Sequence, residues 1–280
     1  MTQSPEVKVE LYFEVGCPFC QEAITGPFNK ILSTESVAAI VNVELYPFGN
    51  SYFVTSECQG GDEYDVKVRK CYNQLCGLEA SDRPEHCFTG DVVCQHGPLE
   101  CEMDRYLACA KWLSNFKAFI AFTHCVETGY GNHQTEALVG SCAASSQIDA
   151  KALGQCFGGR QGDVAVKAQA MATPNHLGVP WILVNGKPME EGKDLLKEVC
   201  KAYKGPAPKA CRGHLLDAVA LGAWTSTFQS LASQPSQQEA VSPFHAHRYK
   251  WIRPVSMFNQ VILRALGVLH GDNLHMLGHI

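Results

Sequence analysis

Two cysteines near the start of the chain have the spacing of a reactive dithiol. Cys17 and Cys20 are separated by Pro18 and Phe19, shortly after the alternating apolar segment Val7–Phe13. A thiol in the first turn of a helix meets unpaired backbone N–H groups and the positive end of the helix dipole, which stabilise its thiolate. A second thiol nearby can then resolve a mixed disulfide. The pair therefore predicts thiol–disulfide exchange, with Cys17 attacking and Cys20 resolving.

Two other uses of such a pair remain open, a structural disulfide or half of a zinc site. Zinc would need a second close pair of Cys or His ligands, and Cys94 and His96 lack the usual spacing. His275 and His279 are spaced i, i+4, but two ligands near a chain end do not make a site. We read His96 as structural, because exchange needs no separate base once the thiolate has formed. We expect neither a metal nor a cofactor.

A second feature, far along the chain, belongs to the same predicted site. Val179 and Pro180 precede the short apolar run Trp181–Val184. A CxxC between a strand and a helix is typical of thioredoxin-like folds. In those folds a proline before a strand commonly takes the cis form and faces the dithiol, where the adjoining backbone can pair with an extended substrate. We therefore expect a cis bond at Pro180, and Val179 and Pro180 as substrate-binding residues.

The elements that must position these residues are strands and helices at both ends of a helical middle. A helix over residues 19–33, kinked by Gly26-Pro27, connects strands over residues 7–13 and 37–46 in a βαβ opening. Apolar spacing and turn residues predict the later elements, which are helices over residues 99–125, 148–171 and 192–203 and a strand over residues 179–184. This order predicts a mixed α/β (α+β) fold.

Length and composition exclude several classes of protein. The 280 residues are 46% hydrophobic and 18% charged, which excludes wholesale disorder. The net charge of −5, from 23 basic and 28 acidic residues, offers no basic surface for a nucleic-acid backbone. The most apolar stretch, residues 255–269, contains Asn259, Gln260 and Arg264, so we expect no transmembrane segment. We expect a soluble protein that does not bind nucleic acid.

The cysteine content points to an oxidising compartment. The 14 cysteines are an even number and far more than a reducing cytosol usually holds without metal or redox chemistry. Residues 1–5 leave no room for the basic, apolar and small-residue parts of a secretory signal ahead of Val7. From this we expect a chain that is either truncated or not secreted.

Residues 94–109 carry a long and specific pattern. Their sequence, CQHGPLECEMDRYLAC, resembles the signature CQHGxxECxxNxxxxC of the gamma-interferon-inducible lysosomal thiol reductases. The likeness covers about residues 7–50 and 94–211, including YPFGN at 46–50 and VPWILVNGKP at 179–188. It implies a disulfide-rich, thioredoxin-like sheet with an inserted helical subdomain. It also implies a lysosomal, endosomal or secreted thiol reductase that reduces protein disulfides in acid, with Cys17 and Cys20 as the catalytic pair.

Four features depart from that family's pattern. Asp104 stands where the signature has Asn, residues 51–93 are longer than usual, residues 212–280 have no counterpart that we recognise, and no N-x-Ser/Thr sequon occurs. The missing sequon weakens delivery by a glycan tag. Asp104 leaves the dithiol untouched and puts a local structural contact in doubt. We expect residues 51–93 to be a surface elaboration rather than core.

The cysteines divide into even groups along these boundaries. Two form the CxxC, four lie in residues 51–93 and eight lie in the family-like remainder. The simplest hypothesis gives the insertion two bridges of its own and the remainder four, with none between the groups. We expect a thiol reductase domain over residues 7–211, with this Cys-containing insertion at 51–93 and a mainly helical insertion at 94–172.

Residues 212–280 differ in charge from the rest of the chain. They hold five basic and three acidic residues and six of the 11 histidines. In an acidic compartment the histidines would charge, and this C-terminal extension would dock on the acidic remainder or on anionic membranes. The alternative is a flexible or removable extension, since residues 226–242 are rich in small and polar residues. Its role is unassigned.

Reduction of disulfides at acidic pH requires that Cys17 be partly ionised there. An unperturbed cysteine, with a pKa of about 8.5, is hardly ionised at about pH 5. No Lys or Arg flanks the motif, and Glu14 and Glu22 would oppose ionisation if they lie close. The helix start must then dominate and lower the pKa of Cys17 by at least about one unit.

Three functions from different classes remain open from the sequence. The first is a protein-disulfide reductase that acts on disulfide-containing protein substrates and is regenerated by a small-thiol reductant. The second is a disulfide oxidase or isomerase of the same fold, which Pro18 after the first cysteine also suits. The third is a redox-silent secreted binding or defence protein in which Cys17 and Cys20 only staple a helix start. The redox potential of the pair separates them.

Overall fold

A four-stranded sheet of order β2-β1-β5-β6 stands at the centre of the structure, a computed structural model that describes residues 6–61, 63–77, 83–131 and 135–213. β1 (Val7–Phe13) pairs in parallel with β2 (Val41–Pro47) and antiparallel with β5 (Trp181–Val184). β5 then forms a hairpin with β6 (Lys187–Pro188). This sheet, with a βαβ opening, a helical insertion and a ββα close, confirms the predicted thioredoxin-like α/β fold class.

The connection from β1 to β2 is a helical segment with a π-helical turn in its middle. It comprises α1 (Pro18–Ala23), the turn Ile24–Phe28, α2 (Asn29–Ser33) and the short α3 (Glu35–Ala38). The predicted kink is this turn, because Pro27 has no N–H to donate to the α-helical ladder.

The predicted start of the second strand at residue 37 was wrong. Val37 is buried in α3, and β2 begins only at Val41. Over so few residues, the apolar pattern of a buried helical turn cannot be told from that of a buried strand.

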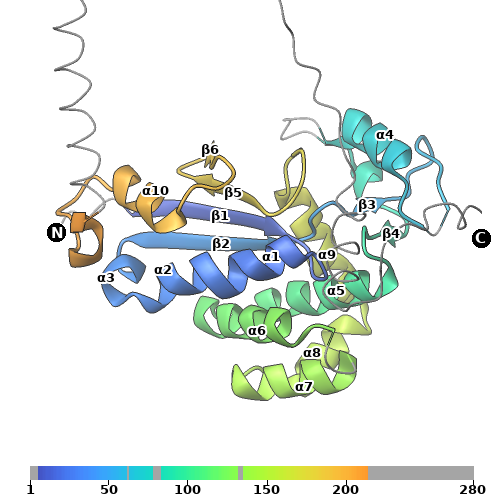
Figure 1. Ribbon diagram of the computed structural model, residues 1–280. Coiled ribbons are helices and arrows are strands. Elements are labelled where there is room, and N and C mark those ends of the chain that lie inside the picture. The colour runs from blue at the N-terminus through green and yellow to red at the C-terminus, as the bar shows by residue number, and fades with distance from the viewer. Residues whose placement is uncertain (1–5, 62, 78–82, 132–134, 214–280) are drawn as a thin grey trace, which may run out of the picture. The chain divides into compact units, whose positions relative to one another are not determined.

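Helices α5 to α9 form the insertion between the two parts of the sheet. Figure 1 shows α6, α7 and α8 below the sheet and α9 at its right-hand end, and α5 and α9 pack against β2. Their bounds are α5 (Pro98–Leu113), α6 (Phe116–Gly129), α7 (Thr135–Ser145), α8 (Ala150–Phe157) and α9 (Arg160–Ala172).

Each of the two long helices predicted in this region is divided in two. The side chain of Asn115 accepts a hydrogen bond from the N–H of Ala118 (3.0 Å) and starts α6. Gly158 and Gly159 separate α8 from α9. Capping side chains and glycines end a helix without interrupting its apolar spacing, so periodicity alone missed both breaks.

Residues 51–93 form a small unit with a core of its own. β3 (Tyr52–Phe53) pairs with β4 (Val92–Val93), beside α4 (Val66–Cys76) and the 3₁₀ turn Glu85–Phe88. The expectation of a surface elaboration rather than core was wrong, because aromatic side chains pack around a disulfide and against α9. The buried residues of this core are Phe48, Tyr52, Phe53, Tyr72, Cys76, Cys87, Phe88, Val93 and Ala170.

Six disulfides join these elements. They are Cys58–Cys71 and Cys76–Cys87 in the 51–93 unit, and Cys94–Cys101, Cys109–Cys156, Cys125–Cys142 and Cys200–Cys211 in the remainder. All 14 cysteines lie in described residues, and no bridge joins the two groups, which confirms the predicted partition. One bridge fastens α5 to α8 and another fastens α6 to α7.

The closing helix α10 (Leu195–Ala202) packs against β1 and β5, above the sheet in Figure 1. The expected extension, residues 212–280, lies outside the described residues from position 214 onward. Within the described ranges, no helix combines the length and the apolar character needed to cross a bilayer.

Candidate active site

The two motif cysteines lie at the start of α1, at the end of the sheet where β1 stops. Cys17 is the N-cap residue, Pro18 takes the first helical position and Cys20 lies in the first turn. They are the free cysteines among the 14, all of which are described. Cys17 is 5% exposed and Cys20 is 0% exposed. The sulfur that a substrate can reach is therefore that of Cys17.

The pKa values of the two thiols are shifted in opposite directions. The Cys20 thiol donates a hydrogen bond to the Cys17 sulfur, and with the backbone N–H groups of Phe19 and Cys20 it lowers the pKa of Cys17 to about 6, against the effect of burial. Burial and the neighbouring Cys17 sulfur raise the pKa of Cys20. At neutral pH the geometry thus favours a Cys17 thiolate beside a protonated Cys20.

The loop before β5 faces Cys17. The bond Val179–Pro180 is cis, as expected from the sequence, and the carbonyl oxygen of Val179 lies 3.9 Å from Cys17 Sγ. Trp181, the first residue of β5, packs on Tyr12 of β1 at a ring distance of 5.1 Å. The sheet therefore brings together residues that lie some 160 positions apart in the chain.

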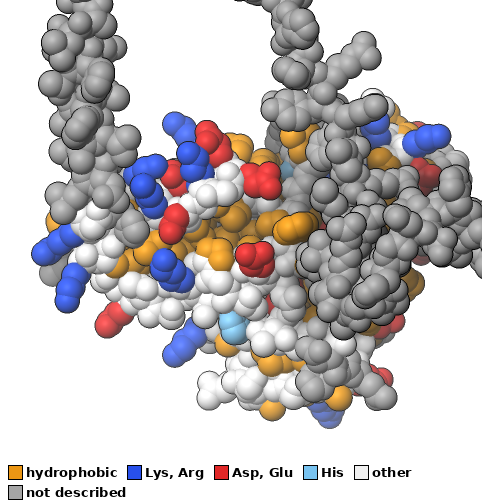
Figure 2. Space-filling view, viewed as in Figure 1, with side chains coloured by type: hydrophobic (Ala, Val, Ile, Leu, Met, Phe, Trp, Pro, Cys, Tyr) orange, Lys and Arg blue, Asp and Glu red, His pale blue; other side chains and the backbone are white. Residues whose placement is uncertain are grey.

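Exposed apolar side chains lie on the surface around the dithiol. Phe19, between the two cysteines, is 66% exposed, and Leu177, two residues before Val179, is fully exposed. Figure 2 shows hydrophobic side chains gathered across the middle of the face that carries the strands and α1. Such a surface suits an apolar, extended partner.

The loop before α5 contacts Glu14, which lies three residues before Cys17. The Cys94–Cys101 bridge closes it, and Gly97 takes a φ of 94°, a conformation that favours glycine, just before the helix. The imidazole of His96 lies 2.7 Å (Nδ1) from Glu100 Oε2 and 3.5 Å from Glu14 Oε1. The hydrogen bond to Glu100 raises the pKa of His96.

Besides Glu100, three carboxyl groups are buried near the dithiol, those of Glu14, Asp104 and Glu127. Glu14 accepts a hydrogen bond from the N–H of Asn50 (2.6 Å), and burial raises its pKa to about 8. Asp104 accepts one from the N–H of Val15 (3.0 Å), while its second oxygen and both carboxyl oxygens of Glu127 have no partner among the described residues. Burial raises the pKa of Asp104 and of Glu127.

Sequence reasoning missed most of this group. It took His96 as structural and Asp104 as a residue that affects a local contact and leaves the dithiol untouched; the carboxyl of Asp104 accepts a hydrogen bond from the N–H of Val15, two residues before Cys17. The signature could have pointed to His96 and Glu100, which it contains, and to position 104, where this chain has Asp in place of the signature's Asn. Glu127 lies outside any motif, and nothing in the sequence marks it.

Two groups of side chains in the described residues bring three possible metal ligands within 4.8 Å of one another. They are Cys76-His86-Cys87 and Glu14-His96-Glu100. The two sulfurs of the first group are bonded to each other. In the second group the atoms hydrogen-bond to one another and to the backbone of Asn50. We assign neither group to a metal.

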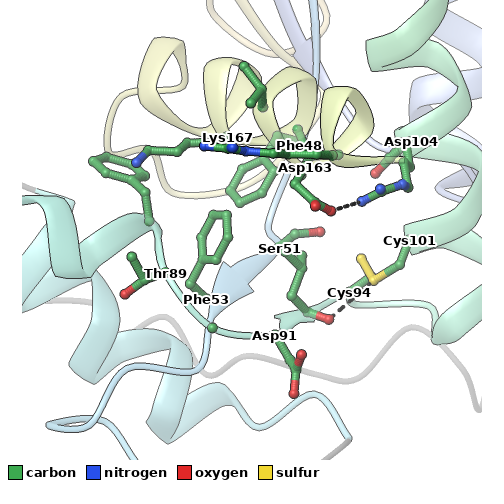
Figure 3. Close-up of a pocket in the computed structure, with 17 residues that line it drawn as sticks. Phe48, Ser51, Phe53, Thr89, Asp91, Cys94, Cys101, Asp104, Asp163 and Lys167 are labelled. Carbon is green, nitrogen blue, oxygen red and sulfur yellow. Dashed lines mark hydrogen bonds and ion pairs between the residues drawn. A yellow bond between two sulfur atoms is a disulfide. The ribbon is translucent and has the colours of Figure 1, made fainter. Parts of the chain in front are cut away.

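A cavity of about 510 Å³ is lined in part by the Cys94–Cys101 bridge. Figure 3 shows Phe48 and Phe53 on one wall, Lys167 and Asp163 of α9 on another, and the bridge beside Asp104. Two of its basic side chains are already in ion pairs, Arg105 with Asp163 at 2.7 Å and Lys167 with Glu85. Neither Cys17 nor Cys20 lines it, so the cavity is separate from the dithiol.

Comparisons with known proteins point to one family. A family model described as gamma interferon inducible lysosomal thiol reductase matches residues 8–76 and 76–146. The chain is 30% identical over 220 residues to the gamma-interferon-responsive lysosomal thiol protein of Arabidopsis thaliana, which covers 75% of this chain and 77% of that protein. It is 27% identical over 209 residues to the gamma-interferon-inducible lysosomal thiol reductase of Mus musculus, covering 72% of this chain and 70% of that one.

Among solved structures, the oxidoreductase DsbA from Xylella fastidiosa is similar over 71% of this chain and 83% of its own, with a TM-score of 0.36 and 15% sequence identity.

Proposed function

Because the chain belongs to the gamma-interferon-inducible lysosomal thiol reductase family, we propose that it reduces disulfide bonds in proteins through Cys17 and Cys20. The observation that supports this most is the pair itself. In a chain whose other 12 cysteines are bridged, these two are free, adjacent and placed at a helix start. We take residues 7–211 as the reductase domain, since they hold all the cysteines and the sheet.

The exchange runs in two steps. The Cys17 thiolate attacks one sulfur of the substrate disulfide, so that a bond to Cys17 forms, the substrate S–S bond breaks and the leaving sulfur takes up a proton. Cys20 then loses its proton and attacks the Cys17 sulfur, which releases the second substrate thiol. The substrate gains two electrons and the pair becomes a Cys17–Cys20 disulfide. A small-thiol reductant restores the dithiol by the reverse exchange.

The substrate in this proposal is an extended, disulfide-containing polypeptide. The carbonyl of Val179 beside Cys17 offers a backbone acceptor, and Pro180 fixes the loop that presents it. Phe19 and Leu177 supply apolar contact around the thiol. Such a partner is available where proteins are unfolded and their buried disulfides are exposed.

The compartment proposed is acidic and oxidising, lysosomal or endosomal, or the exterior after secretion. The relatives' names place those proteins in lysosomes. Six bridges in this chain suit an environment in which disulfides persist. A Cys17 pKa of about 6 leaves a useful thiolate fraction in mild acid.

The experiment that tests the proposal measures the redox potential of the pair together with reduction of insulin at acidic and neutral pH. A reductase should reduce insulin with a small thiol as electron donor, and Cys17→Ser should abolish the reaction. A redox potential of the pair of about −120 mV, as in strong oxidants, together with no reduction of insulin, would favour a disulfide oxidase instead. A pair that exchanges with neither oxidant nor reductant would refute both.

A further inference from the structure

A cluster of ionisable side chains lies behind the dithiol and has no part in the exchange steps above. Glu14 follows β1, His96 precedes α5, Glu100 and Asp104 lie on α5, and Glu127 lies on α6. The four carboxyl residues are at most 5% exposed, whereas the His96 side chain is 32% exposed. The cluster is therefore closed to solvent at its carboxyl groups and open at the imidazole.

Contacts with Glu100 and Glu14 connect the imidazole to the segment that leads into the dithiol. His96 Nδ1 lies 2.7 Å from Glu100 and 3.5 Å from Glu14, and the His96 N–H also donates to Glu100. Glu14 is three residues before Cys17, and its backbone hydrogen-bonds to the Cys20 sulfur. The short loop closed by the Cys94–Cys101 bridge limits how far His96 can move. Its position next to Glu14, three residues before Cys17, is thus fixed by a covalent bond and by two carboxyl groups.

The other ionisable groups that face this cluster keep one charge state in the range of interest. Burial raises the pKa of Tyr64 to about 12 and also raises that of Tyr130, so both phenols stay neutral. Arg69, which donates to the backbone oxygen of Asn50 (2.6 Å), stays positive. Cys20 stays protonated because burial raises its pKa. The groups that change charge around Cys17 are therefore the carboxyls and His96.

These groups respond to acid in the same direction. Burial raises the pKa of Glu14 to about 8 and raises the pKa of Asp104 and Glu127, so these carboxyls become neutral as the pH falls. A neutral carboxyl no longer repels the Cys17 thiolate. The raised pKa of His96 makes the imidazole positive over the same range, and that charge lowers the pKa of Cys17. Acid thus removes negative charge and adds positive charge beside the nucleophile.

We propose that His96, held by Glu100, is a positioning residue that keeps a fraction of Cys17 ionised in acid by presenting an imidazolium beside a neutral Glu14. The inference rests on the proposed function and deepens it, since it explains how one dithiol remains a nucleophile in an acidic compartment.

The first test measures the rate at which iodoacetamide alkylates Cys17 between about pH 4 and pH 9, in the full chain after mild reduction of the dithiol. Mass spectrometry of the peptide that contains Cys17 reads the rate. His96→Gln can keep a hydrogen bond to Glu100 without charge and should lower the rate at about pH 5 roughly tenfold. His96→Lys should restore it. His86→Gln changes an exposed histidine outside the cluster and should leave the profile unchanged.

The second test needs no substitution. Linkage requires that His96 bind its proton more tightly when the Cys17 thiolate is present, by the factor with which His96 stabilises the thiolate. An NMR titration should therefore give a higher His96 pKa in the reduced protein than in the protein with a Cys17–Cys20 disulfide. Equal values in the two forms would overturn the inference, even if no His96 variant folds.

The remaining outcomes are also decisive. A His96→Gln protein with six native bridges and an unchanged acid profile would overturn the inference, and so would His96→Lys if it failed to restore the rate. Alkylation and the NMR titration use no disulfide substrate. A protein that titrates as expected but reduces nothing would therefore refute the proposed function and leave the role of His96 standing.

Discussion

At the scale of single residues, Cys17 and Cys20 have the same chemistry and unequal surroundings. The hydrogen bond from Cys20 and the N–H groups at the start of α1 stabilise charge on Cys17, whereas burial opposes charge on Cys20. A buried, protonated thiol cannot attack a substrate first, but it attacks well once Cys17 is held in a mixed disulfide beside it. The proposed order of attack rests on this difference.

Replacing Cys20 by Ser should trap a covalent complex between Cys17 and the substrate. The hydroxyl cannot attack the mixed disulfide, so the second step stops. Ser keeps a hydrogen-bond donor beside Cys17, so the first step should still run. Non-reducing electrophoresis with a disulfide-containing substrate detects the trapped complex.

Cys17→Ser is the matched control for this trap and should form no complex. A complex that forms with Cys17→Ser and not with Cys20→Ser would reverse the assigned roles.

At the scale of elements, the disulfides Cys109–Cys156 and Cys94–Cys101 have different roles. Cys109–Cys156 closes a separation of 47 residues and ties α5 to α8, whereas Cys94–Cys101 closes one of 7 residues. In the chain-entropy account a bridge stabilises the fold more when it closes a longer loop. The short bridge adds less stability but fixes the loop that carries His96 beside the dithiol.

Double replacement by Ala should separate stability from function. Removing Cys109–Cys156 should lower the free energy of unfolding by about 4 kcal/mol, and removing Cys94–Cys101 by about 2 kcal/mol. Removing Cys94–Cys101 should nevertheless lower the activity at about pH 5 more than removing Cys109–Cys156 does. Without the short bridge, the loop that carries the His96 charge can move away, and that charge favours the Cys17 thiolate. Denaturant unfolding and insulin reduction measure the two effects. An acid activity unaffected by loss of the short bridge would contradict the role given to that loop.

At the scale of the whole molecule, burial of carboxyl groups links stability to pH. Glu14 has an unfolded pKa of about 4.3, and burial raises it to about 8 in the fold. A carboxyl whose pKa is raised by folding stabilises the protein in acid, and this contribution is lost as the pH rises towards the folded pKa. Asp104 and Glu127 act in the same direction. His176 opposes them, because burial lowers its pKa to about 4.

The protein with an oxidised dithiol should therefore be more stable at about pH 5.5 than at about pH 8, by about 2 kcal/mol or more. Glu127→Gln should flatten this dependence, since it removes a buried carboxyl whose oxygens have no partner in the described structure. Glu22→Gln, at an exposed position of α1, is the matched control and should leave it unchanged. Thermal unfolding across this pH range measures the effect, and a melting temperature that rises towards pH 8 would contradict it.

Local sequence patterns predicted those strands and turns that neighbouring residues alone determine. β1 was placed at its observed bounds, because alternation and β-branched residues over Val7–Phe13 leave no competing structure. The Asn185-Gly186 turn, with positive φ at both residues, was likewise marked by its residue types. The start of β2 at Val41 and the break before α6 were missed, because packing and capping decide them and periodicity does not change there.

The sequence by itself determined the dithiol, its place between a strand and a helix, and the grouping of the other cysteines, because spacing along the chain is enough for each. Only the tertiary structure decided that His96, Asp104 and Glu127 lie beside that dithiol. These residues reach it from α5, α6 and the loop before α5, which are remote from Cys17 in sequence. Their charge depends on burial, and burial is a property of how the helices pack against the sheet, which no single segment contains.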